Sequence, residues 1–170
     1  MELATSLPEL RLIVDHDLRR KVSEIWEYVL EARKIEITDL DRLPFTTSIA
    51  NCELTFLAHK RLLLRLADST IRNLGASLPN VRINRDRIIA GVMLIDIGKL
   101  LDHTAPYQNL HHISIGLDLA AKFQIPPGVS HIVASHSKAS THQPSTIEAI
   151  IVRHLDLLTY SAAQVRDNNQ

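Results

Sequence analysis

Apolar side chains recur at every third or fourth residue along most of this chain, and this spacing constrains the fold more than any other feature. The clearest run lies between residues 18 and 30 and consists of Leu18, Val22, Ile25, Trp26, Val29 and Leu30. Such a stripe covers one face of an α-helix, whereas a half-buried strand alternates at every second residue. We therefore predict an all-α fold that forms a single compact helical bundle.

Local start and stop signals divide the chain into helices. The predicted helices span about residues 15–33, 48–74, 84–97, 110–123, 129–136 and 144–165. Gly75 and Gly98 are expected to end the second and third of these, because glycine readily adopts the left-handed conformation that closes a helix. We expect one domain over residues 1–170, with an N-terminal helix and connector in 1–47 and a bundle in 48–165.

The charge balance and the cysteine content narrow the possible functions. The 170 residues include 19 basic and 19 acidic side chains, so the net charge of zero creates no field that would attract nucleic acid or an anionic membrane. Cys52 is the single cysteine, which excludes an internal disulfide and a cysteine-rich zinc site and fits a cytoplasmic location. We expect a small-molecule substrate, no membrane partner and no evident nucleic-acid surface. The N-terminal helix offers a possible homodimer contact.

Ionisable side chains interrupt the apolar faces of the predicted helices at five positions. They are His59, Asp96, His112, His136 and Asp156. Each histidine alone is most simply a hydrogen-bonded core residue. The two carboxylates need cationic partners, because burying an unpaired carboxylate costs several kcal/mol, and we see no arginine or lysine on these stripes. A metal ion would satisfy both residue types, and mixed nitrogen and oxygen ligands suit Mn, Fe, Co, Ni or Zn better than Ca or Mg.

The order and local motifs of these residues resemble the HD-domain superfamily of metal-dependent hydrolases. The motifs are His59, I-D-I-G-K at 95–99, H-I-S-I-G at 112–116, A-S-H at 134–136 and H-L-D-L-L at 154–158. The resemblance covers roughly residues 50 to 160. It implies an all-α bundle that holds metal between its helices. It also implies that His59, Asp96 and Asp156 bind a first ion, and that Asp96 with His112 and His136 binds a second.

One position departs from the family pattern. The family is named for a His-Asp pair, and Ile95 stands where that histidine is expected. Isoleucine cannot bind a metal, so three outcomes stay open. The first site binds more weakly, metal binding shifts to Asp96, His112 and His136, or metal binding is lost.

The resemblance also implies a chemistry. A divalent metal, which we expect to be Mn, Fe, Zn, Co, Ni or Mg, would activate water to hydrolyse a phosphomonoester or phosphodiester. The expected small-molecule substrate is then a phosphate ester or a nucleotide. Asp96 and Lys99 would be catalytic, and Lys99, His111 and His142 would bind substrate. Lys99 is equally explained as a solvated lysine at a helix C-terminus, where a positive charge is favourable. Two alternatives remain: a metal-depleted HD-fold binding or regulatory module, and a divergent HD-fold enzyme with another chemistry.

Overall fold

The computed structural model describes residues 3–50 and 52–167, and the all-α prediction is confirmed. The α-helices are α1 (Leu3–Ser6), α2 (His16–Arg33), α3 (Phe56–Ser77), α4 (Arg85–Leu94), α5 (His112–Lys122), α6 (Pro127–Ser135) and α7 (Ile147–Asp167). Short 3-10 helices are η1 (Pro8–Leu12), η2 (Ile37–Asp41) and η3 (Ile97–Leu100). No helix in these described residues is long and apolar enough to cross a membrane.

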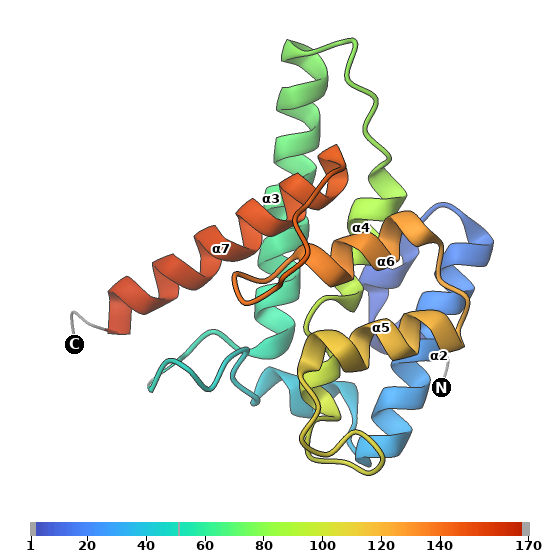
Figure 1. Cartoon of the computed structure of the whole chain (residues 1–170), viewed down its shortest axis with the longest axis vertical. Helices are drawn as coiled ribbons and strands as arrows, with labels where there is room; N and C mark the ends of the chain where they lie inside the picture. Colours follow the sequence, from blue (N-terminus) through green and yellow to red (C-terminus); the bar gives the residue numbers. More distant parts are fainter. Residues whose placement is uncertain (1–2, 51, 168–170) are drawn as a thin grey trace.

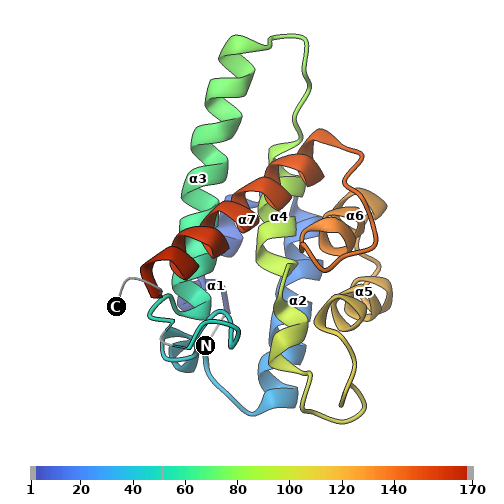
Figure 2. The ribbon, with the colours of Figure 1, turned by 60° about the vertical axis from the view of Figure 1, so that its left-hand side comes forward.

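Helix α4 occupies the centre of the bundle. It packs against α2, α3, α6 and α7, and α7 crosses in front of α3 (Figures 1 and 2). Every residue from 88 to 94 of α4 is buried. Such all-round burial is typical of a central helix rather than an amphipathic surface helix. The end of α4 therefore delivers the next residues, including Asp96, to the interior of the molecule.

The N-terminal helix forms where the sequence predicts it. The Asp15 side chain accepts a hydrogen bond from the Leu18 backbone N at 3.0 Å, which caps the start of α2. The predicted stripe is buried except for Leu30, which is half-buried, and Trp26 packs edge-on against Phe56 with the ring centres 6.3 Å apart. The short helices α1 and η1 were not predicted, because four or five residues are too few for a periodic pattern.

The predicted start of the second helix is wrong. Helix α3 begins at Phe56, after Thr55 accepts a hydrogen bond from the Ala58 backbone N at 3.2 Å, and continues through Gly75 to Ser77. The preceding segment is held as a loop, because the Phe45 backbone N donates to the Leu54 carbonyl at 3.0 Å. Cys52, which the helical pattern places on a buried stripe, is therefore a half-buried loop residue.

The predicted end of the third helix is also wrong. Helix α4 ends at Leu94, and Asp96 adopts the left-handed conformation with φ of 60°. Aspartate tolerates this conformation better than most residues. Gly98 has a different role, because a Cβ atom there would collide with the His112 carbonyl. The missing side chain lets the start of α5 approach the residues that follow α4.

The later helices begin and end within three residues of their predicted bounds. Helix α7 begins at Ile147 rather than at Pro144, after Thr146 accepts a hydrogen bond from the Ala149 backbone N at 3.2 Å. Gly91 allows α4 to lie close to α6, since a Cβ atom at this position would be 2.6 Å from the Ile132 side chain. This close packing brings the end of α6 near the end of α4.

Candidate metal centre

Four of the five ionisable residues of the apolar faces converge around the fifth, Asp96. They form two overlapping groups whose ligand atoms lie within 4.8 Å of one another. The α5–α6 group consists of Asp96, His112 and His136, and the α3–α7 group consists of His59, Asp96 and Asp156. The Asp96 carboxylate belongs to both, which places it where a metal ion at either group would bind.

The α5–α6 group contains two buried imidazole nitrogens without a hydrogen-bond partner. The Nε2 atoms of His136 and His112 lie 3.4 and 3.5 Å from Asp96 Oδ1, and neither has a hydrogen-bond partner among the described residues. The Nδ1 atom of His136 lies 2.8 Å from the Val133 carbonyl. A carbonyl only accepts, so this Nδ1 carries a proton, and in the neutral form of the ring the lone pair is at Nε2.

This geometry fits a metal ion. In that neutral form, the lone pair of His136 faces a carboxylate oxygen at 3.4 Å, and a cation between the two atoms would stabilise the pair. A histidine that binds metal typically donates its other ring N–H to a carbonyl, as His136 does to Val133. Burial lowers the pKa of His112 to about 4, so this ring is neutral near pH 7 and its lone pair is available to a metal.

The imidazole of the α3–α7 group has a different proton arrangement. The Thr159 hydroxyl donates to the Asp156 carbonyl at 2.9 Å, so its oxygen accepts from His59 Nε2 at 3.0 Å. This Nε2 therefore carries the proton, and it lies 3.4 Å from the Asp156 carboxylate. Burial lowers the pKa of His59 to about 3, which keeps the ring neutral. The nitrogen that faces this group is already hydrogen-bonded without a metal.

The two carboxylates of the centre titrate differently. Burial raises the pKa of Asp156 to about 6, and the neighbouring Asp96 charge adds to this effect. Burial also acts to raise the pKa of Asp96, but the nearby positive charge of the Lys99 ammonium holds it well below its usual range. Asp96 is therefore ionised near neutral pH, and Asp156 exchanges its proton close to pH 6.

Lys60 is a buried cation that the sequence analysis missed. Its side chain is 0% exposed, and Nζ donates to the Val92 carbonyl at 2.9 Å and to the Ile95 carbonyl. Burial lowers its pKa to about 8, although Asp96 and Asp156 favour its charged form. The expectation that no lysine lies on these apolar faces is therefore wrong. The signal was available, because Lys60 falls on a second apolar line of α3 that includes Leu57, Leu64 and Ala67.

Lys99 pairs with Asp96 rather than lying free in solvent. Its Nζ is 2.8 Å from Asp96 Oδ1 and 3.2 Å from the Phe45 carbonyl. The side chain is 28% exposed. Ile95, by contrast, is fully buried, and its backbone carbonyl accepts from Lys60.

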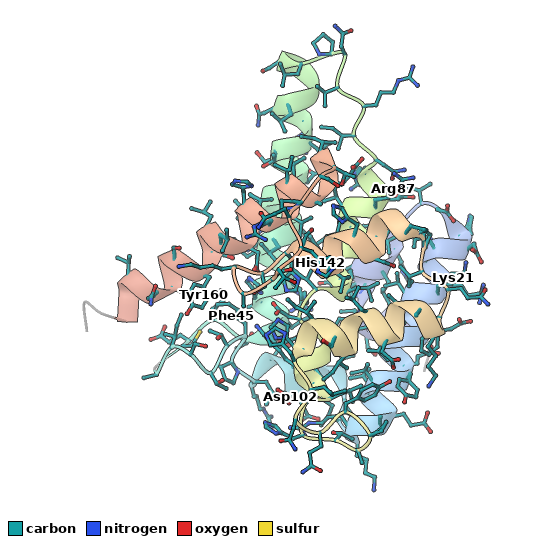
Figure 3. The ribbon with its side chains drawn as sticks, viewed as in Figure 1. Lys21, Phe45, Arg87, Asp102, His142 and Tyr160 are labelled. Carbon is teal, nitrogen blue, oxygen red and sulfur yellow. The ribbon has the colours of Figure 1, made fainter. Side chains whose placement is uncertain are left out.

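A cavity of about 900 Å³ opens beside the centre, and the residues that line it come from several elements. Asp96, Lys99, His112 and Asp156 contribute to its wall, and so does the exposed His111. His111 also caps α5, because its Nδ1 accepts from the Ile113 backbone N. His142 lies on the connection between α6 and α7 (Figure 3) and is not among the described residues that line this cavity.

Two aromatic side chains close one side of the cavity. The Phe45 ring lies 4.3 Å from the His59 ring and 6.3 Å from the Tyr160 ring, and Figure 3 shows Phe45 and Tyr160 beside each other below α7. Sequence reasoning missed Phe45 because a loop residue belongs to no periodic pattern. Its position depends on the backbone pairing with Leu54, which no local signal reveals.

Comparison with known proteins shows similarity to two kinds of enzyme. Ribonuclease Y of Desulforamulus reducens is 32% identical over 120 residues, which are 71% of this chain and 20% of that protein. Ribonuclease Y of Desulforudis audaxviator is 34% identical over 67 residues, or 39% of this chain and 12% of that protein. Dihydroneopterin 2',3'-cyclic phosphate phosphodiesterase of Methanocaldococcus jannaschii is 38% identical over 87 residues, or 45% of this chain and 34% of that protein.

The chain thus spans between 12% and 34% of the length of these relatives. No family model matches the chain, and no solved structure matches it. The similarities, at modest identity, support an HD-like family together with the all-α fold.

Proposed function

We propose that this chain is a metal-dependent phosphodiesterase whose divalent cation is held by Asp96, His112 and His136. The observation that carries the proposal is the pair of buried imidazole nitrogens that face Asp96 without a hydrogen-bond partner among the described residues. The names of the relatives point the same way. One is a ribonuclease and another is a cyclic phosphate phosphodiesterase, and both names denote the cleavage of phosphodiester bonds.

Each residue around the cavity has a separate role in such a reaction. A divalent cation, when bound, supplies an acidified water and polarises a phosphoryl oxygen. Asp96 contributes the negative charge that anchors the cation. Asp156 lines the same cavity with a pKa of about 6, so its carboxylate is suited to accept or return a proton near neutral pH. Lys99 places an ammonium at the cavity wall, where it favours a phosphate group.

The size of the cavity favours a small phosphodiester. A volume of about 900 Å³ is within the range of pockets that enclose small ligands. The balanced charge of the chain gives little long-range attraction for RNA. Phe45 and Tyr160 provide apolar surface beside the phosphate position, which suits a substrate with a flat organic group.

The test measures hydrolysis by the chelator-treated chain after Mn²⁺, Fe²⁺, Co²⁺, Ni²⁺, Zn²⁺ or Mg²⁺ is added. The substrates are bis(p-nitrophenyl) phosphate, a 2',3'-cyclic mononucleotide and a short oligoribonucleotide. We expect metal-dependent cleavage of the small diesters, which His112→Ala and His136→Ala abolish. His154→Ala is the matched control, because His154 is an exposed histidine on α7 that does not contribute to the cavity wall. Absence of hydrolysis with every metal, or full activity of His136→Ala, would overturn the proposal.

One observation favours a second candidate function, a metal-free binding module. The Lys99 ammonium already neutralises Asp96 in the absence of any other cation. Such a module would bind a phosphate ester without hydrolysing it. Binding of the cyclic mononucleotide to chelator-treated protein, unchanged by added metal and without turnover, would favour this candidate.

A further inference from the structure

We propose that the chain binds one metal ion, at the α5–α6 group, and that Lys60 and Thr159 stabilise the α3–α7 group without a metal. The inference rests on the proposed metal-dependent function and adds that the α3–α7 group does not bind a second ion. Both groups have ligand atoms close enough to surround an ion, so distance alone does not choose between them. The hydrogen-bond partners of the imidazoles do.

The nitrogen of His59 that faces the α3–α7 group already has a hydrogen-bond partner. Its Nε2 donates to Thr159, whose own hydroxyl proton is committed to the Asp156 carbonyl. A metal ion at this nitrogen would require the loss of a buried hydrogen bond and the transfer of the proton to Nδ1. His136 needs no such rearrangement, because the Val133 carbonyl already holds its proton at Nδ1.

The two groups also differ in the positive charge that lies next to them. The Lys60 ammonium is fixed by the Val92 and Ile95 carbonyls, immediately before Asp96 in the chain, and its charge acts on both Asp96 and Asp156. The Lys60 charge also acts on His59 but is not among the charges that act on His112, so a divalent ion at the α3–α7 group would be repelled by a cation that has no solvent-exposed surface. Lys60 already provides part of the charge compensation that two buried carboxylates need.

Lys99 is the cation that contacts the α5–α6 group. Lys99 lies 2.8 Å from Asp96 Oδ1, the same oxygen that faces both imidazoles. Its side chain is partly exposed and lines the cavity, so it has room to move away when a metal ion binds. Lys60 has no such room. The α5–α6 group thus combines two imidazole nitrogens that have no hydrogen-bond partner among the described residues with a displaceable ammonium.

The experiment measures how many Mn²⁺ ions the chain binds, by equilibrium dialysis and elemental analysis. We expect one ion per chain, retained by His59→Gln with an affinity within about threefold and weakened at least 100-fold by His136→Gln. His154→Gln, which changes an exposed histidine of α7, is the matched control and should leave the affinity unchanged.

The outcomes separate this inference from the proposed function. Two ions per chain, or loss of the ion in His59→Gln, would overturn the inference and leave phosphodiester hydrolysis possible. One ion that His136→Gln removes, without hydrolysis of any diester, would support the inference and overturn the function. No bound ion would overturn both.

A measurement on the unaltered chain keeps the test valid if His59→Gln fails to fold. Pulsed electron paramagnetic resonance of bound Mn²⁺ counts the imidazole nitrogens in its coordination shell. The α5–α6 group offers two imidazoles and the α3–α7 group offers one. We expect two, and a single coordinated imidazole would overturn the inference.

Discussion

The α3–α7 group and the α5–α6 group share one carboxylate and are built from the same two residue types. Their imidazoles differ in which ring nitrogen donates a hydrogen bond to the protein. In the α3–α7 group, the Thr159 hydroxyl oxygen accepts a hydrogen bond from His59 Nε2. In the α5–α6 group, the Val133 carbonyl accepts a hydrogen bond from the opposite ring nitrogen of His136, and Nε2 has no hydrogen-bond partner among the described residues. The hydrogen-bond partner of each imidazole, rather than the imidazole itself, therefore determines whether a cluster of histidine and aspartate can bind a metal.

The largest effect is expected when the two carboxylates are neutralised one at a time. Asp96→Asn removes the carboxylate that both groups share, whereas Asp156→Asn changes only the α3–α7 group. Asparagine also tolerates the left-handed backbone of position 96, so the variant tests charge rather than strain. We expect Asp96→Asn to lose bound Mn²⁺ and about 1000-fold in kcat/KM. Asp156→Asn should keep its metal, as measured by elemental analysis, and equal loss of metal from both variants would contradict the comparison.

A smaller effect is expected when the fixed cation is removed. Lys60→Met keeps the length of the side chain but leaves the Val92 and Ile95 carbonyls without their donor. Since each buried group left without a partner costs about 1–3 kcal/mol, we expect the free energy of unfolding to fall by about 2–4 kcal/mol. Urea denaturation of the metal-free chain measures this change.

The matched control for Lys60→Met is Lys122→Met. Lys122 is an exposed lysine at the end of α5 that lies over the Tyr28 ring. A change of about 0.5 kcal/mol or less is expected there. Equal effects of the two substitutions would show that the buried ammonium has no special role in holding the end of α4.

Much of the fold was predictable because the helices are amphipathic and long enough to show their period. The exceptions depend on contacts between distant parts of the chain. The loop before α3 has helical spacing, but Phe45 pairs with Leu54 through the backbone. Gly98 looks like a helix stop, but it is required by the close approach of the His112 carbonyl.

The candidate site was predictable as a set of residues but not in its internal differences. Polar side chains on apolar faces indicated His59 and the other four ionisable residues, and the structure brings four of the five around the fifth, Asp96. The partners that separate the two groups could not be predicted, because Thr159 lies 100 residues from His59 along the chain. Lys60 escaped notice because α3 buries two lines of residues instead of one.

The pH dependence of the free energy of unfolding provides a further test of the α3–α7 group. Asp156 has a pKa raised from 3.8 to about 6, so between these values the folded chain binds more protons there than the unfolded chain. The contribution of Asp156 to the free energy of unfolding therefore falls as the pH rises through this window. Asp156→Asn removes this loss, and we expect it to be more stable than the unaltered chain by on the order of 1–3 kcal/mol above pH 6.

The measurement is urea unfolding of the metal-free Asp156→Asn and unaltered chains at several values between pH 4 and pH 7. The difference in stability should shrink toward the lower end, where Asp156 is protonated in the folded chain and the pH approaches the unfolded-state pKa of 3.8. The lowered pKa of His59 acts in the opposite direction but is present in both chains, so it does not enter the difference. A difference that stays constant with pH would contradict the assignment of Asp156 as a buried, raised-pKa carboxyl.

The smallest effect is expected at the acceptor that holds the His59 proton. Thr159→Val keeps the β-branched shape and removes the buried oxygen that lies 3.0 Å from His59 Nε2. The proton of Nε2 can still interact with the Asp156 carboxylate at 3.4 Å, so we expect a loss of only about 1 kcal/mol of stability in urea unfolding. Binding of Mn²⁺ at the α5–α6 group should not change, because no ligand there contacts Thr159. A large change in Mn²⁺ affinity would mean that the two groups act as one site, since the substitution reaches the α5–α6 group only through the shared Asp96.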